Sequence, residues 1–146
     1  MISAMEQRVR HYWTLRSHDF GTVRKNELDN DMGQRWLCEL EKLLPDGKNL
    51  RILDVGTGTG FFAILLSQAG QRVEGIDLTP AMLSEAQEVA AQRGLSIVFR
   101  EMDAQALDYP DESFDVVLSR NLTWTLPEPE KAYREWFRVL KPGGWL

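Results

Sequence analysis

The sequence has one cysteine and no long apolar run among its 146 residues. The lone cysteine, Cys38, excludes an internal disulfide, and its place in a predicted apolar helix predicts a buried, unreactive thiol. The longest apolar stretch, residues 61–66, has six residues, whereas a membrane-spanning helix needs roughly 18. The charged N-terminus also lacks the apolar segment of a signal peptide. These absences predict a cytoplasmic protein that does not enter a membrane.

Basic residues are not in excess, since 22 acidic residues outnumber 17 lysines and arginines and give a net charge of −5. Nucleic acids and anionic membrane surfaces attract clustered positive charge, so this balance disfavours both as partners. The basic residues near the N-terminus are interrupted by acids, which is typical of a solvated surface. The length indicates one domain with a single sizeable core.

The first 47 residues predict two helices joined by a loop. Ser3 can cap the first helix, with Glu6 reaching back to it in a capping box. Its apolar residues follow a helical spacing, and they are Met5, Val9, Tyr12 and Trp13. Residues 17–28 are polar and contain a glycine, which favours a loop. The second helix ends at residues 45–47, and its apolar face consists of Trp36, Leu37, Leu40, Leu43 and Leu44.

After residue 48, short apolar segments alternate with helical ones. The predicted strands are residues 50–55, 72–77, 96–102 and 114–119, and the predicted helices are 61–69, 80–93 and 129–140. Thr79 and Pro80 have the types expected at an N-cap and a first helical position. The pattern predicts an α/β fold, a doubly wound Rossmann-like sheet that is mainly parallel and carries an N-terminal helical cap.

This pattern divides the chain into the helical cap, residues 1–47, and the core, residues 48–146. Residues 140–144 predict a turn before a fifth strand, and the sequence then ends one or two residues into that strand. We therefore expect the sheet to be truncated at the fifth strand, with the C-terminal part of the core missing. An open edge beside the fourth strand would pair with another chain, so we expect a homodimer through that edge.

Three glycines, Gly56, Gly58 and Gly60, follow the first strand, where ligands bind in open α/β sheets. Asp77 ends the second strand, where an acid can accept hydrogen bonds from two ribose hydroxyls or cap the next helix. An NAD site needs the spacing G-x-G-x-x-G. Here the spacing is G-x-G-x-G and Phe61 stands at the position of the third glycine, which disfavours NAD.

Five segments in order resemble motifs of the class I S-adenosylmethionine-dependent methyltransferases of type 11. They are residues 52–60, 75–83, 102–104, 113–121 and 140–144. Residues 121–127 further resemble a subgroup that acts on small molecules. The resemblance covers residues 48–146 and implies S-adenosyl-L-methionine as cofactor and a small molecule as methyl acceptor.

The resemblance also implies residues at the methionine end of the cofactor. Gly56 and the backbone of Arg120 would offer carbonyls to its ammonium group. Asp54 would orient the loop, or it is a purely structural acid at the strand end. The other loop residues expected at the cofactor are Thr57, Gly58 and Gly60.

At the adenosine end, the resemblance implies that Asp77 holds the ribose. Asp103 would face the adenine amino group, and the backbone N–H of Ala104 would meet a ring nitrogen. Leu78 and Met82 would pack on the adenine, although Met82 also has the spacing of a core residue.

The N-terminal region often folds over the cofactor in related enzymes. By this resemblance Tyr12 and Arg16 would belong to a lid, with Arg16 meeting the methionine carboxylate. Trp124 would wall the acceptor pocket, or it packs as a buried aromatic residue.

No residue pair forms an evident acid–base dyad, so the catalytic residues and the acceptor are unassigned, and no metal site is predicted. Methyl transfer from a sulfonium depends chiefly on positioning. Two other functions stay open. One is an NAD(P)-dependent oxidoreductase, which Phe61 disfavours, and the other is a cofactor-binding protein without catalytic activity.

Overall fold

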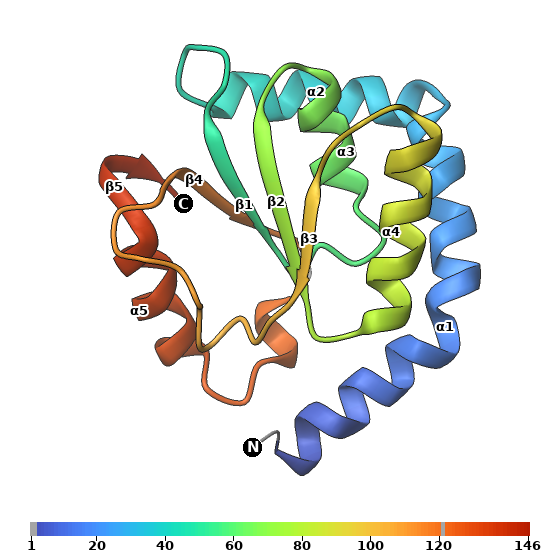
Figure 1. The fold of residues 1–146 in the computed structure, drawn as a ribbon, viewed down its shortest axis with the longest axis vertical. Coiled ribbons are helices and arrows are strands. Elements are labelled where there is room, and N and C mark those ends of the chain that lie inside the picture. Colours follow the sequence, from blue (N-terminus) through green and yellow to red (C-terminus); the bar gives the residue numbers. More distant parts are fainter. Residues whose placement is uncertain (1–2, 121) are drawn as a thin grey trace.

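The computed structural model describes residues 3–120 and 122–146, which form a parallel sheet with helices on both faces (Figure 1). In spatial order the strands are β3 (Val98–Glu101), β2 (Arg72–Asp77), β1 (Arg51–Val55), β4 (Phe114–Ser119) and β5 (Leu140–Trp145). All neighbouring strands pair in parallel. The chain crosses from β1 to β2 and β3 and then returns to β4 on the other side of β1. The predicted doubly wound, Rossmann-like fold is confirmed.

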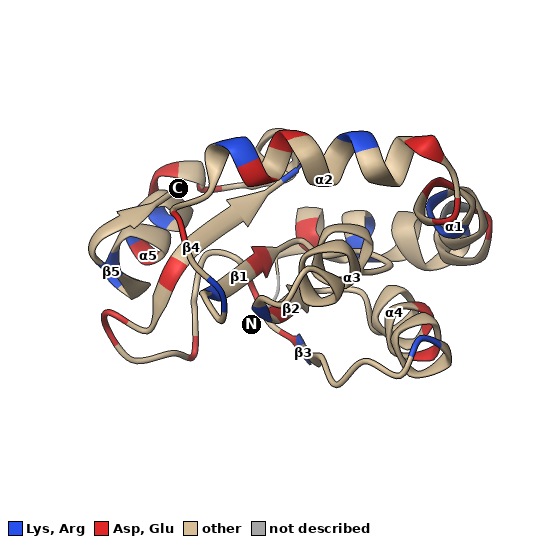
Figure 2. Ribbon diagram, turned by 90° about the horizontal axis from the view of Figure 1, so that it is seen from above, with Lys and Arg blue, Asp and Glu red and all other residues tan. Residues whose placement is uncertain are grey.

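The helices form a layer on each face of the sheet (Figure 1, Figure 2). One layer holds α1 (Ala4–Leu28), α2 (Asp31–Leu43), α3 (Phe61–Gln68) and α4 (Pro80–Gln92), and the other holds α5 (Pro129–Val139). Strand β1 builds both cores, because Ile52 packs with α3 and α4 whereas Leu53 and Val55 pack with α5. Within the two described ranges, no helix has the length and apolar content needed to cross a membrane.

The start of α1 is confirmed, but its predicted end is wrong. The capping box is present, since the Glu6 amide donates to Ser3 Oγ at 3.1 Å and the Ser3 amide donates to Glu6 Oε2 at 2.6 Å. The helix then continues to Leu28, through the segment predicted as a loop.

Packing against α4 explains why residues 17–28 are helical. Lys25 Nζ donates to Gln92 Oε1 of α4 at 3.2 Å. Gly21 permits a close approach of the two helices, because a Cβ there would lie 3.4 Å from the Glu85 side chain. These tertiary contacts stabilise a helix that its own polar sequence does not predict.

The prediction that Cys38 is buried is wrong, because this thiol is exposed. Leu37 and Leu40 of α2 face the core, and Cys38 points about 100° away from Leu37 around the helix axis. Leu43, predicted on the apolar face, is also exposed. The apolar stripe of α2 is therefore narrower than its sequence suggests.

Strand β5 is longer than predicted, and the predicted turn lies inside it. Leu140 pairs with Phe114 and Trp145 pairs with Val116, so β5 advances five residues where β4 advances two. The extra residues form a bulge that contains Gly143 at φ +77°. Strand β4 therefore has a partner on each side, and among the described residues the sheet ends at β5 on this side and at β3 on the other.

The substitution Gly33→Ala is expected to destabilise the fold. A Cβ at Gly33 would lie 2.9 Å from the carbonyl oxygens of Glu27 and Leu28, so the backbone between α1 and α2 must shift. We expect the free energy of unfolding, measured by urea denaturation, to fall by about 1–3 kcal/mol. The exposed neighbour provides a control, since Gln34→Ala should change it by less than about 0.5 kcal/mol. Equal effects of the two substitutions would contradict this account.

Candidate functional site

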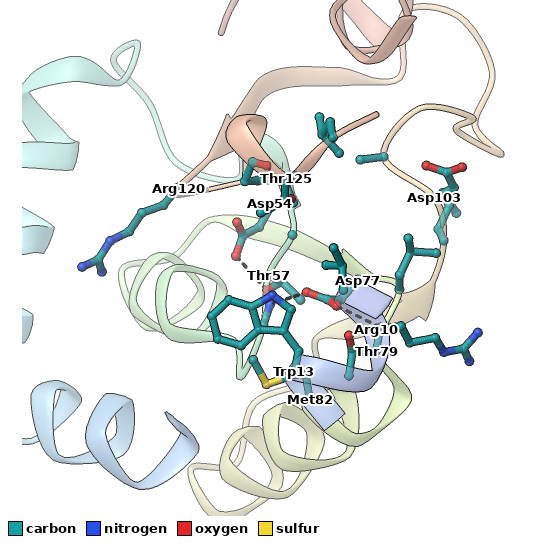
Figure 3. Close-up of a pocket in the computed structure, with 18 of the residues that line it drawn as sticks. Arg10, Trp13, Asp54, Thr57, Asp77, Thr79, Met82, Asp103, Arg120 and Thr125 are labelled. Atoms are coloured by element: carbon teal, nitrogen blue, oxygen red, sulfur yellow. Dashed lines mark hydrogen bonds between the residues drawn. The ribbon is translucent and has the colours of Figure 1, made fainter. Parts of the chain in front are cut away.

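A pocket of about 380 Å³ lies at the carboxyl ends of the central strands (Figure 3). Its walls come from α1, the glycine loop after β1, the junction of β2 and α4, and the segments that follow β3 and β4. The volume suits a small molecule, whose sites typically measure roughly 300–1,000 Å³. This is the place where an open parallel sheet binds its ligand.

The glycine loop uses its own amides to hold its shape. The Thr57 amide donates to the Ile76 carbonyl at 2.9 Å, and the Gly60 amide donates to the Thr57 carbonyl at the same distance. The Gly58 amide donates to Asp77 Oδ2 at 3.0 Å. Phosphate-binding loops instead present such amides to the ligand. Three of the loop amides are therefore committed within the protein, which disfavours a pyrophosphate here.

Asp77 joins the glycine loop to the start of α4. Its Oδ2 accepts from Gly58, and its Oδ1 accepts from the Thr79 amide at 2.9 Å. Thr79 is the N-cap residue as predicted, but its side chain makes no capping bond, and Asp77 supplies one instead. Burial raises the pKa of Asp77. Each carboxylate oxygen can still accept a further hydrogen bond, so Asp77 can also receive hydroxyl groups from a ligand in the pocket.

Asp54 lies at the end of β1, beside Asp77, and its side chain is buried. Burial raises the pKa of Asp54 to about 7, and the charge of Asp77 also raises it. Thr57 Oγ1 donates to Asp54 Oδ2 at 2.7 Å, which favours the ionised form and fixes the loop. The pocket floor therefore holds an acid that titrates near neutral pH.

Gln105 connects α1, the segment after β3 and the start of α5, and no motif singles it out in the sequence. It is buried, and its side-chain amide donates to Asp103 Oδ1 at 3.2 Å and to Glu6 Oε1 of α1 at 3.0 Å. Its carbonyl oxygen accepts from the Glu128 amide, next to α5, at 2.7 Å. In the same segment, Trp136 Nε1 donates to the Ala104 carbonyl at 2.9 Å. The segment after β3 is therefore held from three directions.

Arginine and aromatic side chains meet at another part of the pocket. The guanidinium of Arg120 lies 4.6 Å from the ring centre of Trp36 and 5.5 Å from that of Phe62. Burial, followed by the charge of Arg24, lowers the pKa of Arg120. Arg24 pairs with Glu27 at 2.6 Å. Sequence reasoning singled out only the backbone of Arg120 and missed Arg24, which also lines the pocket.

Most residues predicted at the cofactor lie on the pocket wall. The ten that line it are Asp54, Gly56, Thr57, Gly58, Asp77, Leu78, Met82, Asp103, Ala104 and Arg120. Met82 is also buried, which confirms its prediction as a core residue, whereas its contact with adenine stays a prediction. Trp124 lines the pocket but is 74% exposed, so it is not a buried aromatic residue. Asn121, in the predicted loop after β4, lies outside the described residues.

Three predicted residues are absent from the described lining of the pocket. Gly60 instead starts α3, where a Cβ would lie 3.1 Å from Ala86. Arg16 stacks on Tyr12 at 4.7 Å, on a different side of α1. The face of α1 that does line the pocket carries Glu6, Val9, Arg10, Trp13 and Arg24.

Comparison with known proteins identifies relatives along most of the chain. The methyltransferase domain family matches residues 53–146. Demethylmenaquinone methyltransferase of Thermus thermophilus is 41% identical, over 77% of this chain and 52% of that protein. Ubiquinone biosynthesis O-methyltransferase of Pseudomonas fluorescens is 32% identical, over 98% and 59% respectively. The structure of a SAM-dependent methyltransferase from Aquifex aeolicus matches with a TM-score of 0.65 and 28% identity, over 73% of this chain and 58% of that one.

The chain belongs to the class I S-adenosylmethionine-dependent methyltransferase family, whose cofactor is S-adenosylmethionine. It spans between 36% and 59% of the length of the curated relatives it matches. The site fits this cofactor, because S-adenosylmethionine carries no phosphate. It therefore does not need the amides of Thr57, Gly58 and Gly60, which are already hydrogen-bonded within the protein. The Asp77 carboxylate also retains acceptor capacity for ribose hydroxyls.

The substitution Asp54→Asn is expected to change how stability depends on pH. The pKa is about 7 in the folded chain and 3.8 without burial, so the folded state holds an extra proton between these values. In the wild type this makes the free energy of unfolding fall by up to about 1.4 kcal/mol per unit as the pH rises through that window. Asparagine does not titrate, so the variant should lose this contribution.

Urea denaturation at several pH values between about 4 and 7.5 measures the slope. Asp46→Asn, at an exposed residue, serves as the control and should keep the wild-type slope. An unchanged slope in Asp54→Asn would show that Asp54 does not hold the extra proton.

Proposed function

We propose that this chain binds S-adenosylmethionine in the pocket and transfers its methyl group to a small-molecule acceptor. The observation that carries the proposal is the hydrogen bond at 3.0 Å between the Gly58 amide and Asp77. It removes a loop amide from phosphate binding and leaves a buried carboxylate that can receive two hydroxyls. This combination suits a nucleoside ligand that carries no phosphate.

In the adenosine half of the site, Asp77 would bind the ribose hydroxyls. Asp103 would accept from the adenine amino group, and the Ala104 amide would donate to the ring. Leu78 and Met82 would pack on the ring face. All five residues line the pocket, which supports these assignments.

In the methionine half, the carbonyls of Gly56 and Arg120 would accept from the ammonium group. Asp54 would act through Thr57, because their hydrogen bond at 2.7 Å holds the loop on which Gly56 lies. Gly58 would help to shape the site through its hydrogen bond to Asp77. Gly60 would do so as the N-cap residue at which α3 begins.

Catalysis would depend on positioning rather than on an acid or a base. Bound S-adenosylmethionine supplies a methyl group that is already activated by its sulfonium. The wall formed by Leu122, Trp124 and Thr125 would hold the acceptor near that methyl and exclude water. One relative is named demethylmenaquinone methyltransferase and another ubiquinone biosynthesis O-methyltransferase, which supports a small-molecule acceptor.

We also propose that residues 1–47 act as a helical cap on the core formed by residues 48–146. The contact between Glu6 and Gln105 and the ion pair between Arg10 and Glu101, at 2.5 Å, support this division. Contacts of Tyr12 and Arg16 with the cofactor stay predictions, as does the cytoplasmic location.

Isothermal titration calorimetry with S-adenosylhomocysteine, S-adenosylmethionine and NAD tests the cofactor assignment. We expect both sulfur compounds to bind and NAD to be rejected. Binding of NAD without either sulfur compound would overturn the proposal. A methyl-transfer assay on quinone precursors then separates an enzyme from a binding protein without activity.

The substitution Asp77→Ala is expected to weaken the binding of S-adenosylhomocysteine by about 1–3 kcal/mol, because it removes a buried charged acceptor. Asp77→Asn keeps one acceptor oxygen and should lose less. Calorimetry measures both, with circular dichroism to establish that the variants are folded. Asp19→Asn, on the exposed side of α1, is the control. Unchanged affinity in folded Asp77→Ala would refute the ribose role.

We further propose that the open edge of β5 pairs with a second copy of the chain. Strand β5 ends the spatial order of the sheet, so its outer backbone groups have no strand partner among the described residues. Trp145 on this strand is half-exposed. Unpaired strand edges readily add another strand.

The substitution Trp145→Lys is expected to prevent this association, because an edge lysine opposes strand pairing. Light scattering should give twice the monomer mass for the wild type and the monomer mass for the variant. Leu43→Lys, at another exposed apolar residue, should leave the dimer intact. A monomeric wild type would exclude the homodimer.

A further inference from the structure

The outer side of α1, which faces away from the pocket, carries exposed apolar and basic side chains together. We define the outer α1 surface as Met5, Arg8, Tyr12, Leu15 and Arg16, whose spacing places them on one side of the helix. We propose that this surface docks the protein on an anionic lipid bilayer. The proposal stands apart from the proposed function, because none of the five is among the described residues that line the pocket.

The first observation is the exposure of the apolar side chains on this surface. Leu15 is 72% exposed, Met5 53% and Tyr12 48%. Helix α1 lies at the margin of the molecule in both views of the fold (Figure 1, Figure 2), and its pocket-facing side carries Val9 and Trp13. Neither the core nor the pocket therefore explains the three exposed residues. Contact with an apolar partner would remove them from water, which is favourable.

The second observation is an uneven distribution of charge. Residues 7–18 contain three arginines, Arg8, Arg10 and Arg16, and no acidic residue. Because the whole chain has a net charge of −5, the remaining residues carry −8. The net charge disfavours an anionic surface for the chain as a whole, but this distribution would orient the protein on one. An anionic bilayer would attract the N-terminal half of α1 and repel the rest of the molecule.

The third observation is that two of these arginines have no acidic partner. Within residues 3–120 and 122–146, neither Arg8 nor Arg16 forms an ion pair. Arg10 differs from them, because it pairs with Glu101 at 2.5 Å. The guanidinium of Arg16 instead lies 4.7 Å from the ring centre of Tyr12. The outer α1 surface therefore presents positive charge that the phosphate groups of lipids can neutralise.

The mixture of residue types favours a lipid bilayer over a nucleic acid. A nucleic-acid backbone attracts clustered positive charge, but it offers no apolar surface to an exposed leucine or methionine. At a bilayer, Met5, Tyr12 and Leu15 would enter the boundary between headgroups and acyl chains. Arg8 and Arg16 have long side chains that can reach lipid phosphates from the same depth. A bilayer therefore suits both the apolar and the basic residues.

Docking in this orientation would bring the pocket close to the bilayer. The side of α1 opposite the outer α1 surface carries Val9, Arg10 and Trp13, which line the pocket. An α-helix with its side chains is about 10–12 Å across. The pocket wall formed by α1 would therefore lie about one helix diameter from the lipid headgroups.

Sedimentation with lipid vesicles tests the proposal. One set of vesicles consists of phosphatidylcholine, and the other contains phosphatidylcholine and phosphatidylglycerol in equal amounts. The charge variant combines Arg8→Gln with Arg16→Gln. The apolar variant is Leu15→Ser. Each variant tests one component of the surface, so either can be used if the other does not fold.

Two matched controls separate this surface from the composition of the protein as a whole. Arg35→Gln combined with Arg134→Gln removes the same amount of charge from exposed residues of α2 and α5. Leu43→Ser removes an exposed leucine from α2. Circular dichroism establishes that the variants and the controls are folded.

We expect the wild type to sediment with the vesicles that contain phosphatidylglycerol and to stay in solution with phosphatidylcholine alone. The charge variant should bind roughly tenfold or more weakly, because each arginine near an anionic surface contributes about fivefold in affinity. Leu15→Ser should also bind roughly tenfold more weakly, because it no longer buries a leucine. Both controls should match the wild type.

A wild type that binds neither kind of vesicle, or binds both equally, would overturn the proposal. Controls that weaken binding as much as the two variants do would also overturn it, since the effect would then not belong to α1. A short DNA duplex is the remaining probe. If the wild type binds the duplex and not the vesicles, the outer α1 surface serves a nucleic acid and the lipid proposal is wrong.

Discussion

The carboxylate of Asp77 is the constraint on which the geometry of the site depends. One oxygen holds the loop after β1 through Gly58, and the other holds the start of α4 through Thr79. The two segments therefore cannot move independently. Asp54 adds a second support through Thr57. Burying two neighbouring acids costs free energy, and these hydrogen bonds offset part of that cost.

The core of the fold was predictable because its signals are local. Strands β1 and β4 are short, mainly apolar segments, and a glycine, a proline or a capping residue marks the helix boundaries that follow. The helical state of residues 17–28 was not predictable, because it depends on α4, for example on Gln92, which lies 67 residues beyond Lys25. The start of β5 was also misplaced. Residues 141–144, a lysine, a proline and two glycines, are typical of a turn. In the structure they form a bulge in β5 where it pairs with β4.

The pocket wall combines residues that local sequence places there with residues that distant contacts place there. Residues that directly follow a strand lie at the carboxyl edge of the sheet independently of distant contacts. The motif residues therefore line the pocket at this edge. Gln105 and Arg24 gain their places from contacts between distant segments, and Gln105 meets Glu6 across 99 positions. The helix predicted to form a lid does line the pocket, but Tyr12 and Arg16 lie on a different side of it from the face that reaches the pocket.

Because α1 is continuous, it joins two distant parts of the pocket wall. Glu6 and Arg24 both line the pocket, and 18 residues of unbroken helix separate them, about 27 Å along the axis. A flexible linker would let each end adjust separately to what it touches. In α1 one helix carries both the contact of Glu6 with Gln105 and Arg24, whose charge acts on Arg120. The two ends of the pocket wall therefore depend on the placement of a single helix.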